Sequence, residues 1–257
     1  MLDLEQIGSF YPESLRPFKR NLLREYLQYK ILEALFSSSS AEKLSFMGGT
    51  AVHIVHSINR FSEDLDFDNM GLGAGDFKDI AGIVGKRLRL EGYEVEITHS
   101  FKGAYRAYIN FPGILHEYKL SAHPGEKLMI QIDAEPQRFV YKPGKAMINK
   151  FDVFCSINVV PIDILLAQKI YAIFMRKRAM GRDFYDAIYL LGKTKPNYEY
   201  LRVKVNIKDK DDLKEKLLMK CEKIDMGSLA KDVQPFLFIP SDAKKILLFP
   251  EYINSLR

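Results

Sequence analysis

Tryptophan is absent from this chain of 257 residues, and cysteine nearly so, because Cys155 and Cys221 are its only two. Two cysteines are too few for a disulfide framework or a thiolate metal site. No stretch approaches the roughly 18 uninterrupted apolar residues that a membrane span needs. The first residues, MLDLEQIGSFYPE, lack the basic and apolar regions of a secretory signal. We therefore expect a reduced, cytoplasmic protein with no membrane segment.

The composition is otherwise that of an ordinary globular protein, with 47% apolar and 28% charged residues. The length is sufficient for one large domain or two modest ones. The formal net charge of +5 favours anionic partners only mildly.

Helical and strand-like patterns alternate in the first part of the chain, and helical patterns dominate the rest. Apolar residues recur at helical spacing over residues 13–36, and a second helix is expected to begin after a Gly-Gly turn with Thr50 as its N-cap. Strand-like segments occupy residues 43–47, 64–68, 93–98, 104–111, 127–135 and 154–160. The pattern predicts an α+β fold: a small mixed β-sheet flanked by helices in residues 1–160, and a helical domain in residues 161–257 that closes the active-site cleft.

Acidic residues crowd one predicted strand and recur on another. Side chains alternate faces along a strand, so Asp64, Asp66 and Asp68 share the face opposite Leu65 and Phe67. By the same parity, Asp133 and Gln131 lie opposite Leu128, Ile130 and Ile132, and carboxylates of the two strands converge if these are neighbours. Such a set suits Mg²⁺, two ions of which form the usual clamp for nucleotidyl transfer. The alternative is a solvent-facing row of acids on amphipathic strands.

A glycine pair precedes these acids. The turn Gly48-Gly49-Thr50 lies at the start of the expected helix, where backbone N–H groups and a hydroxyl can approach a phosphate. It is not a P-loop, because no Gly-Lys-Ser/Thr follows, and an ordinary tight turn would also explain it. Arg60 and Ser62 are candidates to contact phosphate or to balance the local charge.

A second group of charged residues lies in the helical part. Lys169 and Arg176 are seven residues apart and share one helical face, and Lys169 is a rare polar position in an apolar helix, which favours a function for it. Arg182 and Asp186 have the spacing of an i,i+4 pair, which is also compatible with a surface ion pair.

The ordered blocks together resemble a known family. Gly48-Gly49-Thr50-Ala51, a helix and Arg60-Phe61-Ser62-Glu63-Asp64-Leu65-Asp66-Phe67, then Asp133 and later Lys169, Arg176, Arg178 and the run from Arg182 to Asp186, resemble the AbiEii-type nucleotidyltransferase toxins. That family belongs to the DNA polymerase β-like nucleotidyltransferase superfamily. His53 and His56 depart from the family's more apolar helix, and we interpret them as ordinary helix residues.

The resemblance implies a role for each block. Asp64 and Asp66 would be the metal-binding pair, Asp133 the third carboxylate, and Gly49-Thr50 the phosphate turn. Lys169 would contact the triphosphate, and Asp183 or Asp186 would complete the site. The implied cofactor is Mg²⁺ or Mn²⁺, the substrate an NTP, the favoured acceptor the 3′ end of tRNA, and the partner a separately encoded antitoxin.

The acceptor and the rival functions are less constrained. Arg176, Arg178 and Arg182 are candidates to contact an RNA acceptor. A metal-dependent nuclease could use the same acids, but it would not need the Gly-Gly-Thr turn. A non-catalytic NTP- or nucleic-acid-binding module is the other alternative. A kinase-type phosphotransferase is disfavoured, because the 63 residues before Asp64 leave no room for a nucleotide lobe and contain no catalytic loop.

Overall fold

The structure, a computed structural model, describes residues 1–256 and divides them into two compact units. Unit 1 comprises residues 1–55 and 61–159, and unit 2 comprises residues 56–60 and the chain from Val160 onward. The predicted boundary after residue 160 lies beside this division. The segment 56–60, just before the acidic run, was not predicted to belong with the helical part.

Unit 1 is built on one mixed sheet. Within the described residues the sheet has seven strands in the order β3-β4-β5-β2-β1-β7-β6. The strands are β1 (Leu44–Met47), β2 (Leu65–Asn69), β3 (Glu96–Ser100), β4 (Tyr105–Phe111), β5 (Leu128–Glu135), β6 (Gly144–Lys150) and β7 (Val153–Val159). Only the β2–β5 and β1–β7 pairs are parallel. The α+β prediction is confirmed, although β6 was not among the predicted strands.

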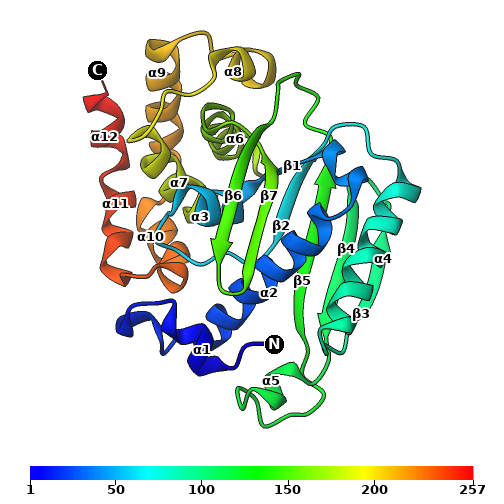
Figure 1. Cartoon of the computed structure of the whole chain (residues 1–257). Helices are drawn as coiled ribbons and strands as arrows, with labels where there is room; N and C mark the ends of the chain where they lie inside the picture. The colour runs from blue at the N-terminus through cyan, green and yellow to red at the C-terminus, as the bar shows by residue number, and fades with distance from the viewer. Residues whose placement is uncertain (257) are drawn as a thin grey trace. The chain divides into compact units, whose positions relative to one another are not determined.

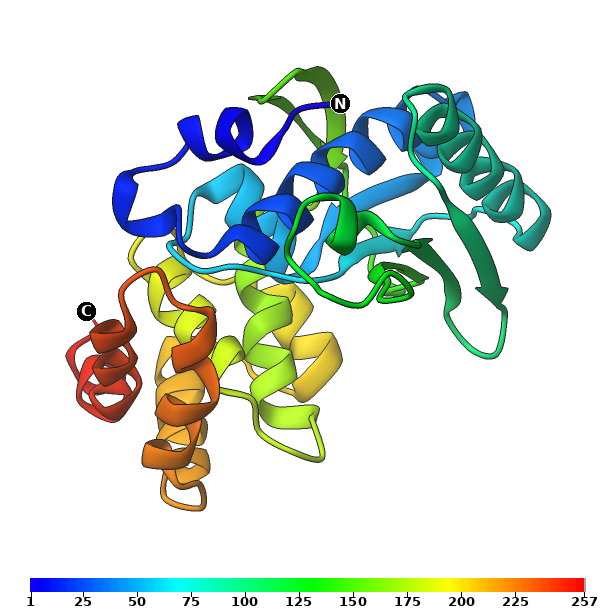
Figure 2. The same cartoon turned by 90° about the horizontal axis from the view of Figure 1, so that it is seen from below.

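The helices of unit 1 lie mainly on one face of this sheet. They are α1 (Leu4–Ser9), α2 (Lys19–Phe36), α3 (Gly48–His56), α4 (Ala74–Leu90) and α5 (Ile114–Glu117), with 3₁₀ turns at Glu13–Leu15 and Ser39–Lys43. Helices α2 and α4 pack against each other and lie in front of the strands in Figure 1, and Figure 2 shows both on the same side of the sheet. The last residue of α3, His56, already belongs to unit 2.

Alternation along the strands separates an apolar face from a polar one. Leu65 and Phe67 of β2 and Ile130 and Ile132 of β5 are buried, whereas Asp66, Gln131 and Asp133 point the other way and are partly accessible. The Phe67 ring lies 6.2 Å from that of Phe36 in α2, so the apolar face is the one that α2 covers. Burial of each such side chain stabilises the folded state by roughly 1.5–3 kcal/mol. The opposite face of these strands carries the polar side chains and is available for polar chemistry.

Unit 2 is helical apart from an isolated bridge between Arg60 and Leu237. Its helices beyond α3 are α6 (Ile162–Met175), α7 (Gly181–Leu191), α8 (Tyr198–Val205), α9 (Lys210–Cys221), α10 (Met226–Val233), α11 (Lys244–Leu247) and α12 (Phe249–Ser255), with 3₁₀ turns at Gln234–Phe236 and Pro240–Ala243. Asn197, Asp209 and Asp225 cap α8, α9 and α10 through their side-chain oxygens.

Helix α7, which carries the predicted acids of this unit, is fixed at its first residue. A Cβ at Gly181 would overlap the backbone of Leu229 in α10, so only glycine allows this close approach. The Gly181 N–H also donates to Asp232 in α10 over 2.9 Å. Further along, the Phe184 ring packs edge-on against Phe249 of α12 at 5.0 Å. These contacts determine where Asp183 and Asp186 lie within unit 2.

Candidate functional site

Two of the predicted carboxylates meet on neighbouring strands of unit 1. Asp66 of β2 and Asp133 of β5 are direct partners in the parallel pair, which places their backbones about 4.8 Å apart on the polar face. Asp64 lies immediately before β2, so its position follows from the loop and not from strand alternation. The predicted convergence of acids from two strands is therefore present for Asp66 and Asp133.

Asp68, the next acid on β2, has a different environment. Its side chain is 3% exposed and accepts hydrogen bonds from the Gln137 backbone N–H at 2.8 Å and the Tyr141 hydroxyl at 2.9 Å. The sequence pattern grouped Asp68 with Asp64 and Asp66 on a non-core face. The segment after β5 covers it instead, because these two donors satisfy a carboxylate that would otherwise be too costly to bury.

Gly48 joins the glycine turn to the acids. Helix α3 begins at Gly48, whose φ is +77°, a conformation that favours glycine. A Cβ at this position would overlap the carboxylate of Asp66, so a second constraint also requires glycine here. The Asp66 carboxylate thus lies at the amino end of α3, where backbone N–H groups and the helix dipole stabilise negative charge.

The loop before β2 is held by its backbone carbonyls. The buried Gln28 of α2 donates from Nε2 to the carbonyl oxygens of Ser62 at 3.1 Å and Glu63 at 2.9 Å. The Thr50 hydroxyl donates to the Asp64 carbonyl. Thr50 is therefore not the N-cap that the sequence predicted, because α3 starts two residues earlier. The Thr50 hydroxyl instead fixes the acidic loop. Nothing in the sequence around Gln28 indicated that its side chain would hold this loop as well.

Asp133 has two donors on its own face of the sheet. Arg106 of β4 places Nε 3.1 Å from Oδ1, and Gln131 of β5 places Nε2 2.8 Å from Oδ2. Arg106 is the direct partner of Asp133 in the antiparallel β4–β5 pair. Arg106 was not among the predicted site residues, although strand alternation over residues 104–111 places it on the face opposite Ala107 and Ile109.

The predicted residues of unit 2 form a buried ion cluster. Arg60 donates to Asp186 through Nε at 2.6 Å and Nη2 at 2.7 Å, and the Lys169 Nζ lies 2.9 Å from the same carboxylate. Arg60 is 1% exposed and Asp186 0%. Burial alone would raise the pKa of Asp186, but the charges of Arg60 and Lys169 outweigh it and hold that pKa below its usual value.

This cluster corrects two expectations. Arg60 was predicted to bind nucleotide, but its guanidinium is buried and committed to Asp186, so we do not retain it as a nucleotide ligand. Asp186 was considered as half of an exposed pair with Arg182, but it is completely buried. The pairing of Arg60 with Asp186 spans 126 residues of sequence and left no local signal.

Asp183 lies one turn before Asp186 in α7. Its carboxylate is 2% exposed, with Arg176 Nε at 2.8 Å and Lys169 Nζ at 3.6 Å. The Arg176 contact is an ion pair without hydrogen-bond alignment, since Asp183 Oδ2 has no aligned donor. Lys169 thus pairs with both acids of α7, and its predicted contact with a triphosphate stays a prediction.

The remaining predicted basic residues lie near the loop between α6 and α7. Arg178 is 83% exposed on its side chain, with Asp232 at 3.7 Å. The Arg182 guanidinium lies 4.4 Å from the centre of the Phe236 ring, a cation–π contact. Their predicted contact with an RNA acceptor stays a prediction.

A third charged cluster joins α2, α3 and β6 of unit 1 and involves a histidine. Glu25 of α2 is 3% exposed and meets His53 Nε2 at 2.9 Å and Lys150 Nζ at 2.7 Å. The Lys150 ammonium also lies 3.9 Å from the centre of the Tyr11 ring. His53 was interpreted as an ordinary helix residue, and this contact ties its helix to α2.

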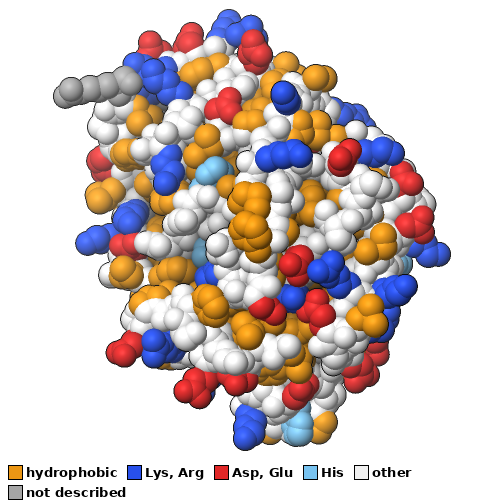
Figure 3. Space-filling model, in the orientation of Figure 1, with side chains coloured by type: hydrophobic (Ala, Val, Ile, Leu, Met, Phe, Trp, Pro, Cys, Tyr) orange, Lys and Arg blue, Asp and Glu red, His pale blue; other side chains and the backbone are white. Residues whose placement is uncertain are grey.

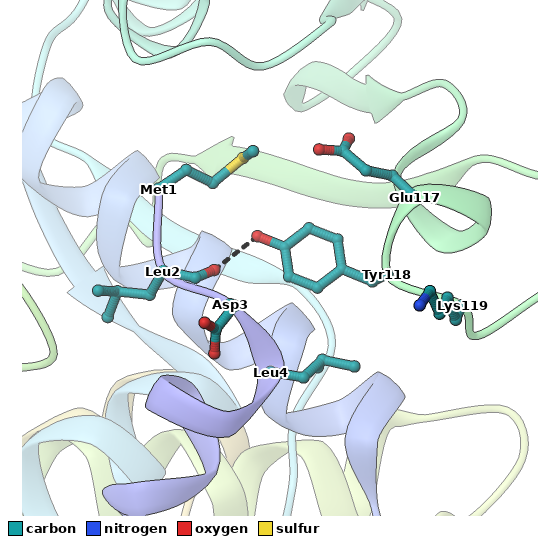
Figure 4. Close-up of a pocket in the computed structure, with 7 residues that line it drawn as sticks. All are labelled: Met1, Leu2, Asp3, Leu4, Glu117, Tyr118 and Lys119. Atoms are coloured by element: carbon teal, nitrogen blue, oxygen red, sulfur yellow. Dashed lines mark hydrogen bonds between the residues drawn. The ribbon is translucent and has the colours of Figure 1, made fainter.

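Two pockets lie away from these charged residues. One of about 330 Å³ is lined by Met1–Leu4 and by Glu117, Tyr118 and Lys119, and Figure 4 shows the Tyr118 hydroxyl donating to the Leu2 carbonyl at 2.7 Å. Another, of about 600 Å³, lies in unit 2 between the end of α7 and helices α9 and α12. Neither contains a predicted site residue.

The described residues contain neither a membrane-spanning helix nor a ready-made set of metal ligands. No helix within residues 1–256 has the length and apolar character to cross a membrane. No group of three or more acids, histidines or cysteines among these residues is already arranged as a set of metal ligands. The carboxylates of Asp66 and Asp133 are nevertheless the oxygen donors that a hard divalent cation prefers.

The model of the nucleotidyl transferase AbiEii toxin family, type IV toxin–antitoxin system, matches residues 30–237. The chain belongs to the AbiEii family. It is accordingly a nucleotidyltransferase toxin of a type IV toxin–antitoxin system, and the predicted resemblance and enzyme class are confirmed. Both the strand acids and the ion cluster of unit 2 lie inside the matched range.

Solved structures support the fold of this AbiEii-family chain. JHP933 from Helicobacter pylori has a TM-score of 0.56 and 17% identity, with 91% of each chain covered. A second structure from H. pylori, described as a "putative nucleotidyltransferase", has a TM-score of 0.55 and 17% identity, with 90% of this chain and 93% of the other covered. At such identity the similarity concerns the fold alone. No curated protein matches the chain.

Proposed function

We propose that the polar face of unit 1 catalyses metal-dependent transfer of a nucleoside monophosphate from an NTP to the 3′ hydroxyl of a tRNA. The observation that carries this proposal is the pairing of Asp66 with Asp133 on adjacent parallel strands, with the Asp66 carboxylate against the Gly48 turn. An acid pair beside a glycine turn at a helix start combines a cation site with a phosphate site.

The reaction assigns each group a part. The acceptor oxygen bonds to the α-phosphorus and its proton passes to water. The bond between the α-phosphorus and the oxygen that bridges to the β-phosphate breaks, and pyrophosphate leaves. Mg²⁺ or Mn²⁺ supplies activation of the acceptor oxygen and neutralises charge on the phosphates. Asp64, Asp66 and Asp133 would hold the cation, and Gly48, Gly49 and Ser62 would orient the phosphates, while the Thr50 hydroxyl holds the loop that carries Asp64. The parts proposed for Lys169 on the triphosphate and for Asp183 follow from the family resemblance, whereas Asp186 is buried against Arg60 and Lys169 and receives no part in the reaction.

The proposal that the acceptor is RNA rests on one short basic segment. Arg176, Lys177 and Arg178 form an exposed basic segment between α6 and α7. Lysine and arginine side chains alternate with acidic ones over the face in Figure 3, so this face offers no broad basic surface for nucleic acid. Phosphate contacts by a short segment would position RNA without reading its sequence, and they weaken as salt rises.

The test supplies purified protein with each α-labelled NTP in turn and with total RNA and protein extract. We expect label on RNA of tRNA size, and loss of labelling with Asp64→Asn plus Asp66→Asn. Because even outer-shell partners of a metal are worth roughly 10–100-fold, the loss should be about a hundredfold or more. The thermal unfolding midpoint should change little, because the carboxylates of Asp64 and Asp66 are accessible to water. Undiminished labelling by the double variant would contradict the assignment of the acids.

A matched pair of variants tests the acceptor separately. Arg178→Ala removes an exposed charge of the basic segment, and Arg202→Ala removes an exposed charge from α8 in the same unit. We expect Arg178→Ala alone to lower RNA labelling and to reduce the salt slope by about one phosphate contact. Label on protein only would refute the RNA acceptor while leaving nucleotidyl transfer intact.

A further inference from the structure

Three charged side chains form one row across the polar face of unit 1. Asp66 of β2 pairs in register with Asp133 of β5, and Asp133 pairs in register with Arg106 of β4. Adjacent strands are about 4.8 Å apart, so a guanidinium lies one strand beyond the two carboxylates. The order of charges along the row is therefore minus, minus, plus.

Both oxygens of the central carboxylate already have a donor. The Arg106 Nε lies 3.1 Å from Oδ1 of Asp133, and the Gln131 Nε2 lies 2.8 Å from Oδ2. The side chains of Arg106 and Asp133 are 36% and 24% exposed, so water screens their interaction only partly. Arg106 brings a full positive charge to Asp133, whereas Gln131 brings a neutral dipole. This difference matters when a cation arrives.

We propose that Arg106 is a positioning residue that neutralises Asp133 while no divalent ion is bound, and that an ion must displace this guanidinium to bind. The inference rests on the proposed metal-dependent function, because it concerns the same carboxylates. A guanidinium and a divalent ion compete for one carboxylate and repel each other at such distances. Gln131 orients the carboxylate without any such competition.

The two donors should therefore affect ion affinity in opposite directions. Without Arg106, Asp66 and Asp133 keep their mutual repulsion until a cation arrives, which strengthens the attraction for that cation. Without Gln131, the carboxylate loses an orienting hydrogen bond of the kind that supports metal ligands. A residue with a merely structural part in the sheet would change folding stability but would not produce opposite shifts in ion affinity.

The measurement is Mn²⁺ binding to the full purified chain by calorimetry, without NTP. We expect Arg106→Gln to bind Mn²⁺ about tenfold more tightly than the unmodified protein, a change of about 1.4 kcal/mol. Gln131→Ala should bind it about tenfold more weakly, the lower end of the effect of outer-shell partners. Arg106→Lys keeps the charge and should restore ordinary affinity. Lys86→Gln, the same charge change on the exposed side of α4, should leave affinity unchanged.

Thermal unfolding provides an independent readout, and Arg106→Ala replaces the glutamine variant if that variant does not fold. The variant lacking Arg106 should unfold at a lower temperature without Mn²⁺ and gain more than the unmodified protein when Mn²⁺ is added.

Two results would overturn the inference. Mn²⁺ affinity that is equal or weaker without Arg106, while Asp66→Asn with Asp133→Asn abolishes binding, would refute the competition and leave the proposed function standing. Mn²⁺ binding that is unaffected by the two Asn substitutions would refute both.

Discussion

The acids of the two units differ in how their charge is balanced. In unit 1, Asp66 and Asp133 are partly accessible, and the contacts around Asp133 combine one guanidinium with one neutral amide. In unit 2, Asp183 and Asp186 are 2% and 0% exposed and are surrounded by basic side chains of the same unit. Acidic residues that look alike in the sequence are therefore balanced differently: those of unit 1 are partly open to solvent, and those of unit 2 are neutralised by buried basic side chains.

The accessible acids of unit 1 can accept a cation from solution. The buried acids of unit 2 depend on the basic side chains that already surround them. Removing one partner of a buried ion pair leaves a charge that water cannot reach, which is expensive. Lys169 stands between these cases, because Arg60 alone already forms a two-point contact with Asp186.

The largest effect is expected at Asp186. The substitution Asp186→Asn leaves Arg60 and Lys169 without the carboxylate that neutralises them, and we expect it to lower the free energy of unfolding by about 3–5 kcal/mol. Asp163→Asn in α6 is the matched control, since Asp163 is partly accessible and bonds the Asn197 side chain at 2.9 Å. Urea unfolding measures both. Equal, small losses for the two variants would contradict the claim that Asp186 is a buried charge on which Arg60 and Lys169 depend.

A smaller effect is expected when Glu25, one of the buried acids of unit 1, is titrated. Burial alone would raise the pKa of Glu25, but His53 and Lys150 outweigh it and lower the pKa from 4.5 to about 2. A depressed pKa in the folded state contributes stability that is complete above the unfolded value and is lost as pH falls towards the folded value. Unfolding free energy should thus fall between about pH 4.5 and pH 2, by roughly 3 kcal/mol from this group.

Glu25→Gln isolates that contribution. The variant should be less stable than the unmodified protein near neutral pH, and the difference should shrink as the medium is acidified below about pH 4.5. Chemical unfolding at a series of pH values makes the comparison. A difference that stays constant with pH would mean that packing, not charge, accounts for Glu25.

The smallest effect is expected at Arg176, whose side chain is 53% exposed although it faces the buried Asp183 at 2.8 Å. Arg176→Ala should cost no more than about 1 kcal/mol of stability, as for other accessible ion pairs. Lys169 remains near Asp183 at 3.6 Å. Thermal and urea unfolding test this value, and a loss as large as that of Asp186→Asn would place Arg176 inside the buried cluster.

Strand parity allowed much of the acid site to be predicted. The alternation of apolar and polar residues placed Asp66 and Asp133 on the non-core faces of their strands, because side-chain direction along a strand has a fixed period. The glycine turn was predicted as well, but its reason was not. The structure shows that Gly48 is required by a positive φ and by the approach of Asp66, a contact that spacing alone does not reveal.

The remaining contacts depend on segments far apart in the chain. Asp68 has the same parity as Asp66, but the segment carrying Gln137 and Tyr141 buries it. Arg60 resembled a phosphate ligand because it precedes the acids, whereas its partner lies on α7. Strand β6 was missed because the lysines and the exposed Met147 in Gly144–Lys150 obscure its alternation. Local patterns define faces and turns, and tertiary pairing decides which charges meet.

The assignment of residues 56–60 to unit 2 has a consequence for any shortened version of this gene. A product that stops at Val159 would carry Arg60 without Asp186, and one that starts at Val160 would carry Asp186 without Arg60. Either piece would have to be made with an unmatched charge where the whole chain buries a pair. We therefore expect nonsense and start-site mutations near this boundary to yield misfolded products instead of an active fragment.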